Sequence, residues 1–172
     1  LLSWGRGSFG QLGLGNCNDT ATPTLVGRED TFGSGVLMVA CGTFHTLAVT
    51  QEGDLFSWGL GAKGRLGHGD DSDKHVPVRV GFHDEIAVTS VAAGDEHSVA
   101  VTADGILFTF GMACLEAEDS DSDDACAIRL PTGLGHRDLE HKFLPCPLAP
   151  ALFASAPIGC CRQIPPARAL AC

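Results

Sequence analysis

Short apolar runs, each rich in β-branched and aromatic residues, recur along much of the chain. They occupy residues 36–40, 45–50, 54–58, 86–92, 97–102 and 106–110, and glycine, aspartate and asparagine bound them. This spacing is typical of short strands joined by tight turns. The QEGD and ADG stretches are expected to be hairpin turns in which Gly53 and Gly105 take a positive φ. The pattern therefore predicts an all-β fold.

The apolar runs belong to longer stretches that repeat. SWGRGSFGQLGLGN at 3–16 returns as SWGLGAKGRLGHGD at 57–70, so Trp4 corresponds to Trp58 about 54 residues later. CGTFHTLAVT at 41–50 returns as AGDEHSVAVT at 93–102, about 52 residues later. A third LGHRD stands at 134–138, and Pro145 follows it as Pro23 and Pro77 follow the earlier copies. A period of this length is typical of a propeller or another repeat array.

The order of these motifs resembles the regulator of chromosome condensation repeat. That repeat has Gly-x-x-His-Ser/Thr-x-Ala-hydrophobic-Thr, then a glycine, a strand and Trp-Gly, then Gly-x-Leu-Gly-x-Gly and a proline before another strand. Residues 1–112 match this order well and residues 132–148 match it in part. The resemblance implies an incomplete β-propeller of about two to three repeats, each a four-stranded antiparallel blade. Because the chain also begins inside a repeat and without methionine, we expect it to be a piece of a longer propeller.

Residues that recur at the same place in two copies are expected to serve the fold, because a catalytic or metal site needs one unique constellation. His45 and His97 share such a position, and each imidazole is expected to bond to backbone between strands. Trp4 and Trp58 are expected to be packing anchors. The Leu-Gly-x-Gly loops need glycine where their backbone lies close to a neighbouring blade. The predicted structural repeat positions are Trp4, Gly5, Gly10, Gly13, Gly42, His45, Gly53, Trp58, Gly59, Gly64, Gly67, Gly94, His97, Gly105 and Gly111.

The Gly5-x-Gly7-x-x-Gly10 spacing, repeated from Gly59, is also that of a loop that holds a dinucleotide pyrophosphate. Such a loop opens a helix, whose N-terminal amides bind the phosphate. The residues after Gly10 carry further glycines, turn formers and Pro23, with no helical spacing of apolar positions. We therefore interpret both copies as turns, and we predict no cofactor. No nucleophile and base stand at a recognisable spacing either, so no catalytic residue and no enzyme activity are assigned.

The chain divides into four segments on this interpretation. Residues 1–112 are propeller repeats, 113–131 an acidic insertion, 132–149 a partial third repeat, and 150–172 an irregular tail that carries proline and cysteine. Proline is disfavoured in central strands, and six of the nine prolines lie between 145 and 166.

The acidic insertion permits three interpretations. Six acids and no bases lie between Glu116 and Asp124. A calcium loop would use Asp119, Asp121 and Asp123, but glycine and the bidentate glutamate are missing from their required places. Phosphorylation of Ser120 and Ser122 is the second interpretation. A solvated loop with no site is the third and the favoured one, so no metal ligand is assigned.

Composition limits the partners and the compartment. The net charge of −10 disfavours direct nucleic-acid binding, because neutralising phosphates requires lysine and arginine. No run of 18 apolar residues is present and the first residues do not form a signal peptide, so no membrane partner is expected. The eight cysteines are scattered rather than paired at zinc spacing. We expect them to be reduced, which indicates a cytoplasmic or nuclear protein.

Two function classes follow. The favoured one is a protein-binding scaffold module, which presents loops to a protein partner and packs against other blades of a longer chain. The alternative comes from the resemblance, whose founding member is a guanine nucleotide exchange factor for the small GTPase Ran. Part of an exchange factor for a Ran-like GTPase is therefore the second interpretation. Fold alone does not choose between them.

Overall fold

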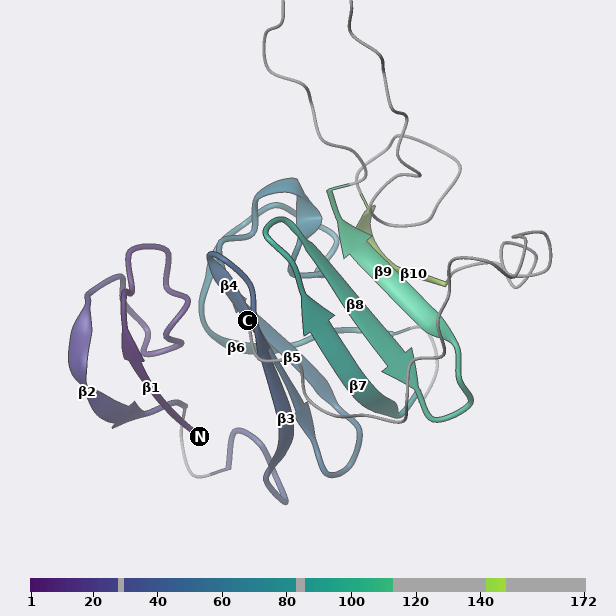
Figure 1. Cartoon of the computed structure of the whole chain (residues 1–172), viewed down its shortest axis with the longest axis horizontal. Coiled ribbons are helices and arrows are strands. Elements are labelled where there is room, and N and C mark those ends of the chain that lie inside the picture. The colour runs from purple at the N-terminus through teal and green to yellow at the C-terminus, as the bar shows by residue number, and fades with distance from the viewer. Residues whose placement is uncertain (28–29, 83–85, 113–141, 148–172) are drawn as a thin grey trace, which may run out of the picture.

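The computed structural model describes residues 1–27, 30–82, 86–112 and 142–147, which form three antiparallel sheets side by side (Figure 1). The first sheet has two strands, β1 (Leu2–Gly5) and β2 (Thr20–Leu25). The second has four, in the order β3 (Val36–Cys41), β4 (His45–Thr50), β5 (Leu55–Gly59) and β6 (Lys74–Arg79). The third also has four, in the order β7 (Val88–Ala93), β8 (His97–Thr102), β9 (Leu107–Gly111) and β10 (Lys142–Pro147).

The two four-stranded sheets are copies of one blade. In the second sheet His45 pairs with Gly59 and Val49 pairs with Leu55. In the third, His97 pairs with Gly111 and Val101 with Leu107, which is the same register one repeat later. The hairpin turns within these blades contain Gly53 and Gly105 at φ 90° and 81°, as the turn sequences predicted.

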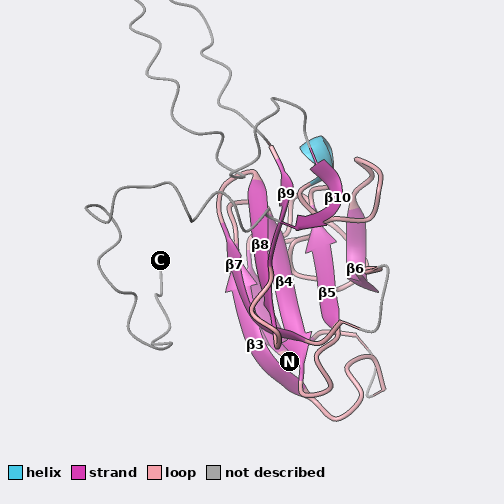
Figure 2. Cartoon of the chain, turned by 90° about the vertical axis from the view of Figure 1, so that its right-hand side faces the viewer, coloured by secondary structure: helices cyan, strands magenta, loops and turns pink. Residues whose placement is uncertain are grey.

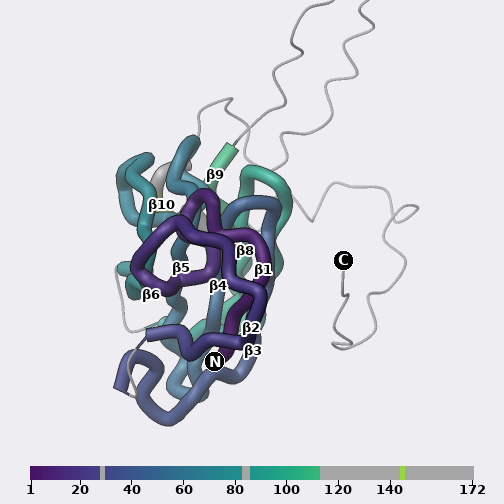
Figure 3. Tube along the Cα trace, turned by 90° about the vertical axis from the view of Figure 1, so that its left-hand side faces the viewer, coloured from purple at the N-terminus to yellow at the C-terminus, as the bar shows by residue number. Residues whose placement is uncertain are grey.

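The two-stranded sheet is the outer half of a third blade. By the repeat numbering, β1 corresponds to β5 and β2 to β6, and β1 pairs with β2 as β5 pairs with β6. In the described residues nothing occupies the place that β3 and β4 take in a complete blade. Figure 3 shows this half-blade, in purple, in front of the neighbouring blade.

The core lies between successive blades. β7 packs against both β3 and β4. Ala48 and Ala100, which hold equivalent places in the two complete blades, are fully buried. The cluster between the complete blades contains Leu47, Val49, Leu55, Val80, Val88, Val91, Ala100, Phe108 and Phe110. A smaller cluster of Val26, Phe32, Ala48 and Trp58 joins the half-blade to its neighbour.

The described residues are almost entirely strand and loop (Figure 2). The one helical element among them is a single 3-10 turn, η1 (Ala62–Gly64). No helix in the described part of the chain is long and apolar enough to cross a membrane. The predicted acidic insertion at 113–131, the tail at 150–172 and most of the partial third repeat lie outside the described residues; β10 is the described part of that repeat.

Candidate protein-binding surface

We call the interface between two neighbouring blades a seam. At each seam in the described residues, a glycine in a loop of one blade packs against an aromatic ring of the next blade. Gly13 has φ 72°, and a Cβ there would lie 2.8 Å from Trp58 Nε1 of the next blade. Gly67 has φ 75°, and a Cβ there would lie 2.9 Å from Cδ2 of Phe110. Phe110 occupies in the third sheet the place of Trp58 in the second. These glycines are therefore required both by the backbone conformation and by the close approach of a ring.

Hydrogen bonds reinforce the seams at equivalent positions. The Thr46 hydroxyl donates to the Gln11 carbonyl at 2.9 Å, and the Ser98 hydroxyl donates to the Arg65 carbonyl at 2.8 Å. Trp58 Nε1–H also donates to the Gln11 carbonyl, at 2.9 Å. Each loop carbonyl thus accepts from the following blade, which satisfies a backbone group that would otherwise be buried unpaired.

His45 joins two blades through a side chain, whereas the sequence predicted a backbone partner. Its Nε2 lies 2.9 Å from the Ser98 hydroxyl of the next blade, and its ring is completely buried. The pKa of His45 is lowered to about 4, chiefly by burial and in smaller part by electrostatic interaction with Arg65 and His97. The main chain at these positions bonds within the turn: the Gly42 amide donates to the His45 carbonyl at 2.9 Å, and the Gly94 amide donates to the His97 carbonyl at 2.9 Å.

The other predicted repeat positions lie in turns and at strand ends. Gly5, Gly59 and Gly111 end β1, β5 and β9 with φ near 108°, and Gly10 and Gly64 have φ 74° and 75° in the loops. Gly42 and Gly94 each lie against an imidazole, of His45 and His97, so neither site has room for a Cβ. Trp4 differs from its counterpart: it is 58% exposed, whereas Trp58 is 1% exposed. Gly13 of the half-blade lies against Trp58, whereas no loop glycine among the described residues lies against Trp4.

The glycine motifs bind their own chain. The Gly7 amide donates to the Asp19 carboxylate at 2.9 Å, and the Gly61 amide donates to Asp73 at 2.8 Å. The amides of Gly10 and Gly13 donate to carbonyls three residues earlier in the same loop. A carboxylate thus occupies the place that a phosphate would need, and in the second copy the only helical element nearby is η1.

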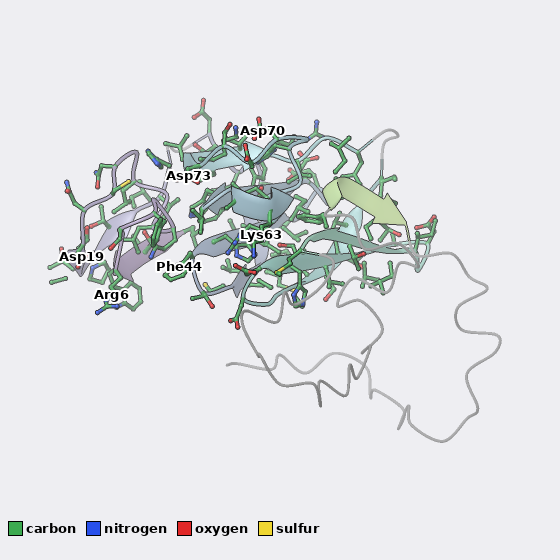
Figure 4. The ribbon with its side chains drawn as sticks, turned by 90° about the horizontal axis from the view of Figure 1, so that it is seen from above. Arg6, Asp19, Phe44, Lys63, Asp70 and Asp73 are labelled. Atoms are coloured by element: carbon green, nitrogen blue, oxygen red, sulfur yellow. The ribbon has the colours of Figure 1, made fainter. Side chains whose placement is uncertain are left out.

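Loops from successive blades lie together at one end of the sheets, the loop end. Seen from that end in Figure 4, the loops carrying Arg6, Phe44 and Lys63 follow one another across the molecule. Phe9 and Phe44 form a tilted aromatic pair across the first seam, with ring centroids 4.7 Å apart, and both remain partly exposed. Arg6 is exposed in the same loop as Phe9.

The next seam carries charges at the equivalent positions. Lys63 and Glu96 replace Phe9 and Phe44, and their side chains form an ion pair at 3.1 Å. Arg65 is buried below them; its guanidinium donates to the Asp95 carbonyl at 2.9 Å and contacts Glu96 at 3.3 Å. At the loop end, equivalent positions of the two seams therefore carry different chemistry, aromatic at one and charged at the other.

Sequence reasoning from shared repeat positions missed Phe9, Phe44 and Arg65. The signal that could have found them is a difference between aligned copies: Phe9 against Lys63, and Phe44 against Glu96. Where the residue type differs between two copies while the surrounding motif is kept, the fold does not require one particular side chain.

A cleft of about 370 Å³ lies beside the half-blade. Its lining includes Leu1, Leu2 and Trp4 of the half-blade, and Val39 and Thr46 of the next blade. Leu2 and Trp4 are exposed, and so is Val39. Large apolar side chains gathered around an open cleft are typical of an interaction surface.

No metal centre is found in the described part of the chain, where no group of three or more histidine, cysteine and acidic side chains lies close enough to hold an ion. Cys17 and Cys41, the two cysteines whose side chains are described, are free thiols.

Antiparallel four-stranded blades packed side by side, with glycine loops at their seams, define an incomplete β-propeller. The model of the regulator of chromosome condensation (RCC1) repeat matches residues 1–49 and 52–101. The chain belongs to this repeat family, which confirms the predicted family and fold class. Repeats of this kind form propellers that serve as protein-interaction modules.

Known proteins share the repeats but are longer. The chain is 45% identical over 111 residues to the ultraviolet-B receptor UVR8 of Arabidopsis thaliana, covering 64% of this chain and 25% of the receptor. It is 39% identical over 113 residues to the E3 ubiquitin-protein ligase HERC2 of Homo sapiens, again over 64% of this chain but only 2% of the ligase. The chain thus spans a quarter or less of these two relatives.

Solved structures show the same fold. Human WBSCR16 matches with a TM-score of 0.64 and 27% identity, over 86% of this chain and 34% of that protein. Prp20p from Saccharomyces cerevisiae matches with a TM-score of 0.66 and 24% identity, over 86% and 34% of the two chains. The report of the Prp20p structure describes its binding to Gsp1p and histones.

Proposed function

We propose that this chain is a protein-binding scaffold module, with no catalytic activity of its own, whose loop end is the docking surface. The observation that carries the proposal is the exposed Phe9–Phe44 pair beside Arg6. Aromatic residues, phenylalanine among them, and arginine are enriched in the buried cores of protein interfaces. They lie on loops, which can vary without changing the fold.

The charge of the chain limits the partner. A net charge of −10 favours a protein with a neutral or basic surface and opposes direct binding to nucleic acid. A cytoplasmic or nuclear partner fits the interpretation of the cysteines as reduced thiols. A small GTPase is one candidate, since Prp20p is described as binding Gsp1p, but at 24% identity that likeness supports the fold alone.

The test compares two exposed apolar residues at opposite ends of the sheets. Phe44 is 37% exposed at the loop end, and Ile106 is 40% exposed in the β8–β9 hairpin at the other end. A partner is captured on the wild-type chain, identified and purified, and its affinity is measured by calorimetry. Phe44→Ser should weaken binding about tenfold or more, as for an interface anchor, while Ile106→Ser should change it less than about twofold.

The opposite ranking of the two variants, or equal effects on affinity, would show that the loop end is not the docking surface.

A second assay decides between the two function classes. The chain is added to a small GTPase loaded with a fluorescent guanine nucleotide, and release is followed in time. The scaffold proposal expects the intrinsic release rate; a catalytic acceleration would make the chain part of an exchange factor instead.

A further inference from the structure

A loop of the half-blade holds a thiol against an imidazole of the next blade. Cys17 lies in the loop between β1 and β2, and His75 is the second residue of β6. The Sγ atom of Cys17 lies 3.6 Å from Nε2 of His75, which is hydrogen-bond distance for sulfur. Cys17 is exposed and His75 is partly exposed, so a small molecule in solution can reach both groups.

Main-chain contacts hold the two groups in place. Gly10 lies so close to His75 that a Cβ there would be 2.5 Å from Cδ2 of the imidazole. The Gly15 amide, two residues before Cys17, donates a hydrogen bond to the His75 carbonyl at 2.8 Å. The loop therefore fixes the imidazole on one side and the segment that carries the thiol on the other. A nucleophile whose neighbouring base is itself oriented is the arrangement that activates a cysteine.

The fold does not require this pair. In the aligned copies Cys17 corresponds to Asp71, and His75 corresponds to Phe143, because His75 and Phe143 each stand two residues before the recurring proline. Neither replacement offers a thiol or an imidazole. A residue that serves the fold recurs with the repeat, whereas a chemical site needs one unique constellation. Cys17 and His75 meet the second condition.

Cys41 provides a contrast within the same chain. Its thiol is also exposed, but its hydrogen-bond partner is the hydroxyl of Thr46, which is not a base at neutral pH. Desolvation by the surrounding protein raises the pKa of Cys41. Because the thiolate is the nucleophilic form of cysteine, Cys41 is expected to react slowly. The imidazole beside Cys17 can accept the thiol proton as the sulfur attacks, so Cys17 is expected to react fast.

We propose that Cys17 is a modification site that forms a mixed disulfide with a low-molecular-weight disulfide, and that His75 is its general base. The Cys17 sulfur attacks one sulfur of the small disulfide, so that a new S–S bond forms and the original S–S bond breaks. Nε2 of His75 takes the thiol proton and returns it to the departing thiolate, which leaves as a free thiol. Cys17 is oxidised and half of the small disulfide is reduced, so no other oxidant is needed. The inference does not depend on the loop end or on its partner.

The experiment measures the exchange at each cysteine. The reduced chain is mixed with oxidised glutathione at pH 7 with a metal chelator present, the reaction is stopped with acid, and peptide mass spectrometry gives the initial rates at Cys17 and Cys41. Cys17 should react about tenfold faster than Cys41 or more, because a general base assists its proton transfer. In the chain unfolded by urea the two rates should become similar, since the imidazole is then no longer beside the thiol. An advantage of Cys17 that persists in urea would come from its neighbours in the sequence and would overturn the proposal.

Two variants of adjacent residues in β6 identify the group responsible. His75→Gln keeps a hydrogen-bonding side chain but removes the proton acceptor, so it should slow the exchange at Cys17 about tenfold and leave Cys41 unchanged. Lys74→Gln is the matched control, because it removes a positive charge from the preceding residue and leaves the imidazole in place. In about 0.15 M salt, which screens such a charge, it should change the rate at Cys17 less than about twofold.

Three outcomes would overturn the proposal. An unchanged rate at Cys17 in His75→Gln, with the fold retained by circular dichroism, would show that the imidazole takes no part in the exchange. Equal slowing by Lys74→Gln would show that positive charge on β6 attracts the negatively charged glutathione and that proton transfer is not involved. Equal slowing of Cys17 and Cys41 in His75→Gln would attribute the effect to a change of the fold and remove His75 as the base.

Discussion

At the scale of single residues, His45 links the stability of the fold to pH. Its imidazole is buried and neutral, its Nε2 bonds to Ser98, and its Nδ1 has no hydrogen-bond partner among the described residues. Its pKa is about 4 in the folded protein, against 6.5 for an ordinary histidine. As the pH falls below 6.5 the unfolded chain takes up a proton before the folded one, so stability falls between pH 6.5 and about 4.

This gives a first prediction. The contribution of His45 should amount to about 3 kcal/mol between those two pH values, from the size of the pKa difference. Urea unfolding at pH 7.5, 6.0, 5.0 and 4.5 should show His45→Gln less stable than the wild type at pH 7.5 but less sensitive to acid. Parallel pH curves for the two proteins would mean that His45 does not titrate on unfolding.

Gly67 carries the second prediction at this scale. Both Gly67 and Gly105 have a positive φ, but only Gly67 faces a neighbour, the ring of Phe110. Gly105→Ala should cost about 1 kcal/mol, the strain of a left-handed backbone. Gly67→Ala should cost about 3 kcal/mol, because overpacking against the ring is added to that strain. Thermal unfolding of both variants measures the difference in stability. Equal losses of stability would show that the seam can accommodate an added methyl group at Gly67 without strain.

At the scale of elements, the repeats made the strands and turns predictable. The apolar runs at 36–40, 45–50 and 97–102 lie in β3, β4 and β8, and the hairpin glycines have the positive φ that was expected. Physical reasoning succeeds here because a strand and its turn are specified by nearby residues. The runs at 54–58, 86–92 and 106–110 are displaced by one or two residues from β5, β7 and β9, since pairing with neighbours sets the ends of a strand.

Contacts between blades were less predictable, because they join residues in different copies. The bond from His45 to Ser98 replaces the expected backbone partner, and nothing near His45 in the sequence indicates it. Arg65 is buried where the first copy has Gln11, and its burial depends on Asp95 and Glu96 of the next blade.

The glycine loops carry the third prediction, at the scale of the element. Because the amides of Gly7 and Gly61 already donate to carboxylates, a phosphate would have to displace Asp19 or Asp73. Calorimetric titration of the chain with NAD or ATP should therefore show no saturable heat of binding at ligand concentrations up to about 1 mM, which corresponds to a binding free energy of only about −4 kcal/mol. Micromolar binding that disappears in Gly61→Val would reverse this interpretation of the loops.

At the scale of the whole molecule, the stability of a repeat array is a sum of blade and seam contributions. The two complete blades share a buried cluster and the His45–Ser98–Arg65 hydrogen bonds. The half-blade has two strands and a smaller cluster, and the Gln11 carbonyl joins it to the next blade through Thr46 and Trp58. The half-blade should therefore open at a lower free energy than the rest.

Trp58→Phe tests this unequal coupling. The third sheet already has phenylalanine at the equivalent position, Phe110, so a phenyl ring should still pack against Gly13, while the hydrogen bond to Gln11 and part of the buried packing of the indole are lost. The loss should be about 2 kcal/mol, one such bond plus the cavity that the smaller ring leaves. In native-state hydrogen exchange, amides of β1 and β2 should then exchange about thirtyfold faster, while those of β8 and β9 change little. Equal acceleration in all strands would show that the half-blade and the complete blades open as one unit, and that no seam is weaker than another.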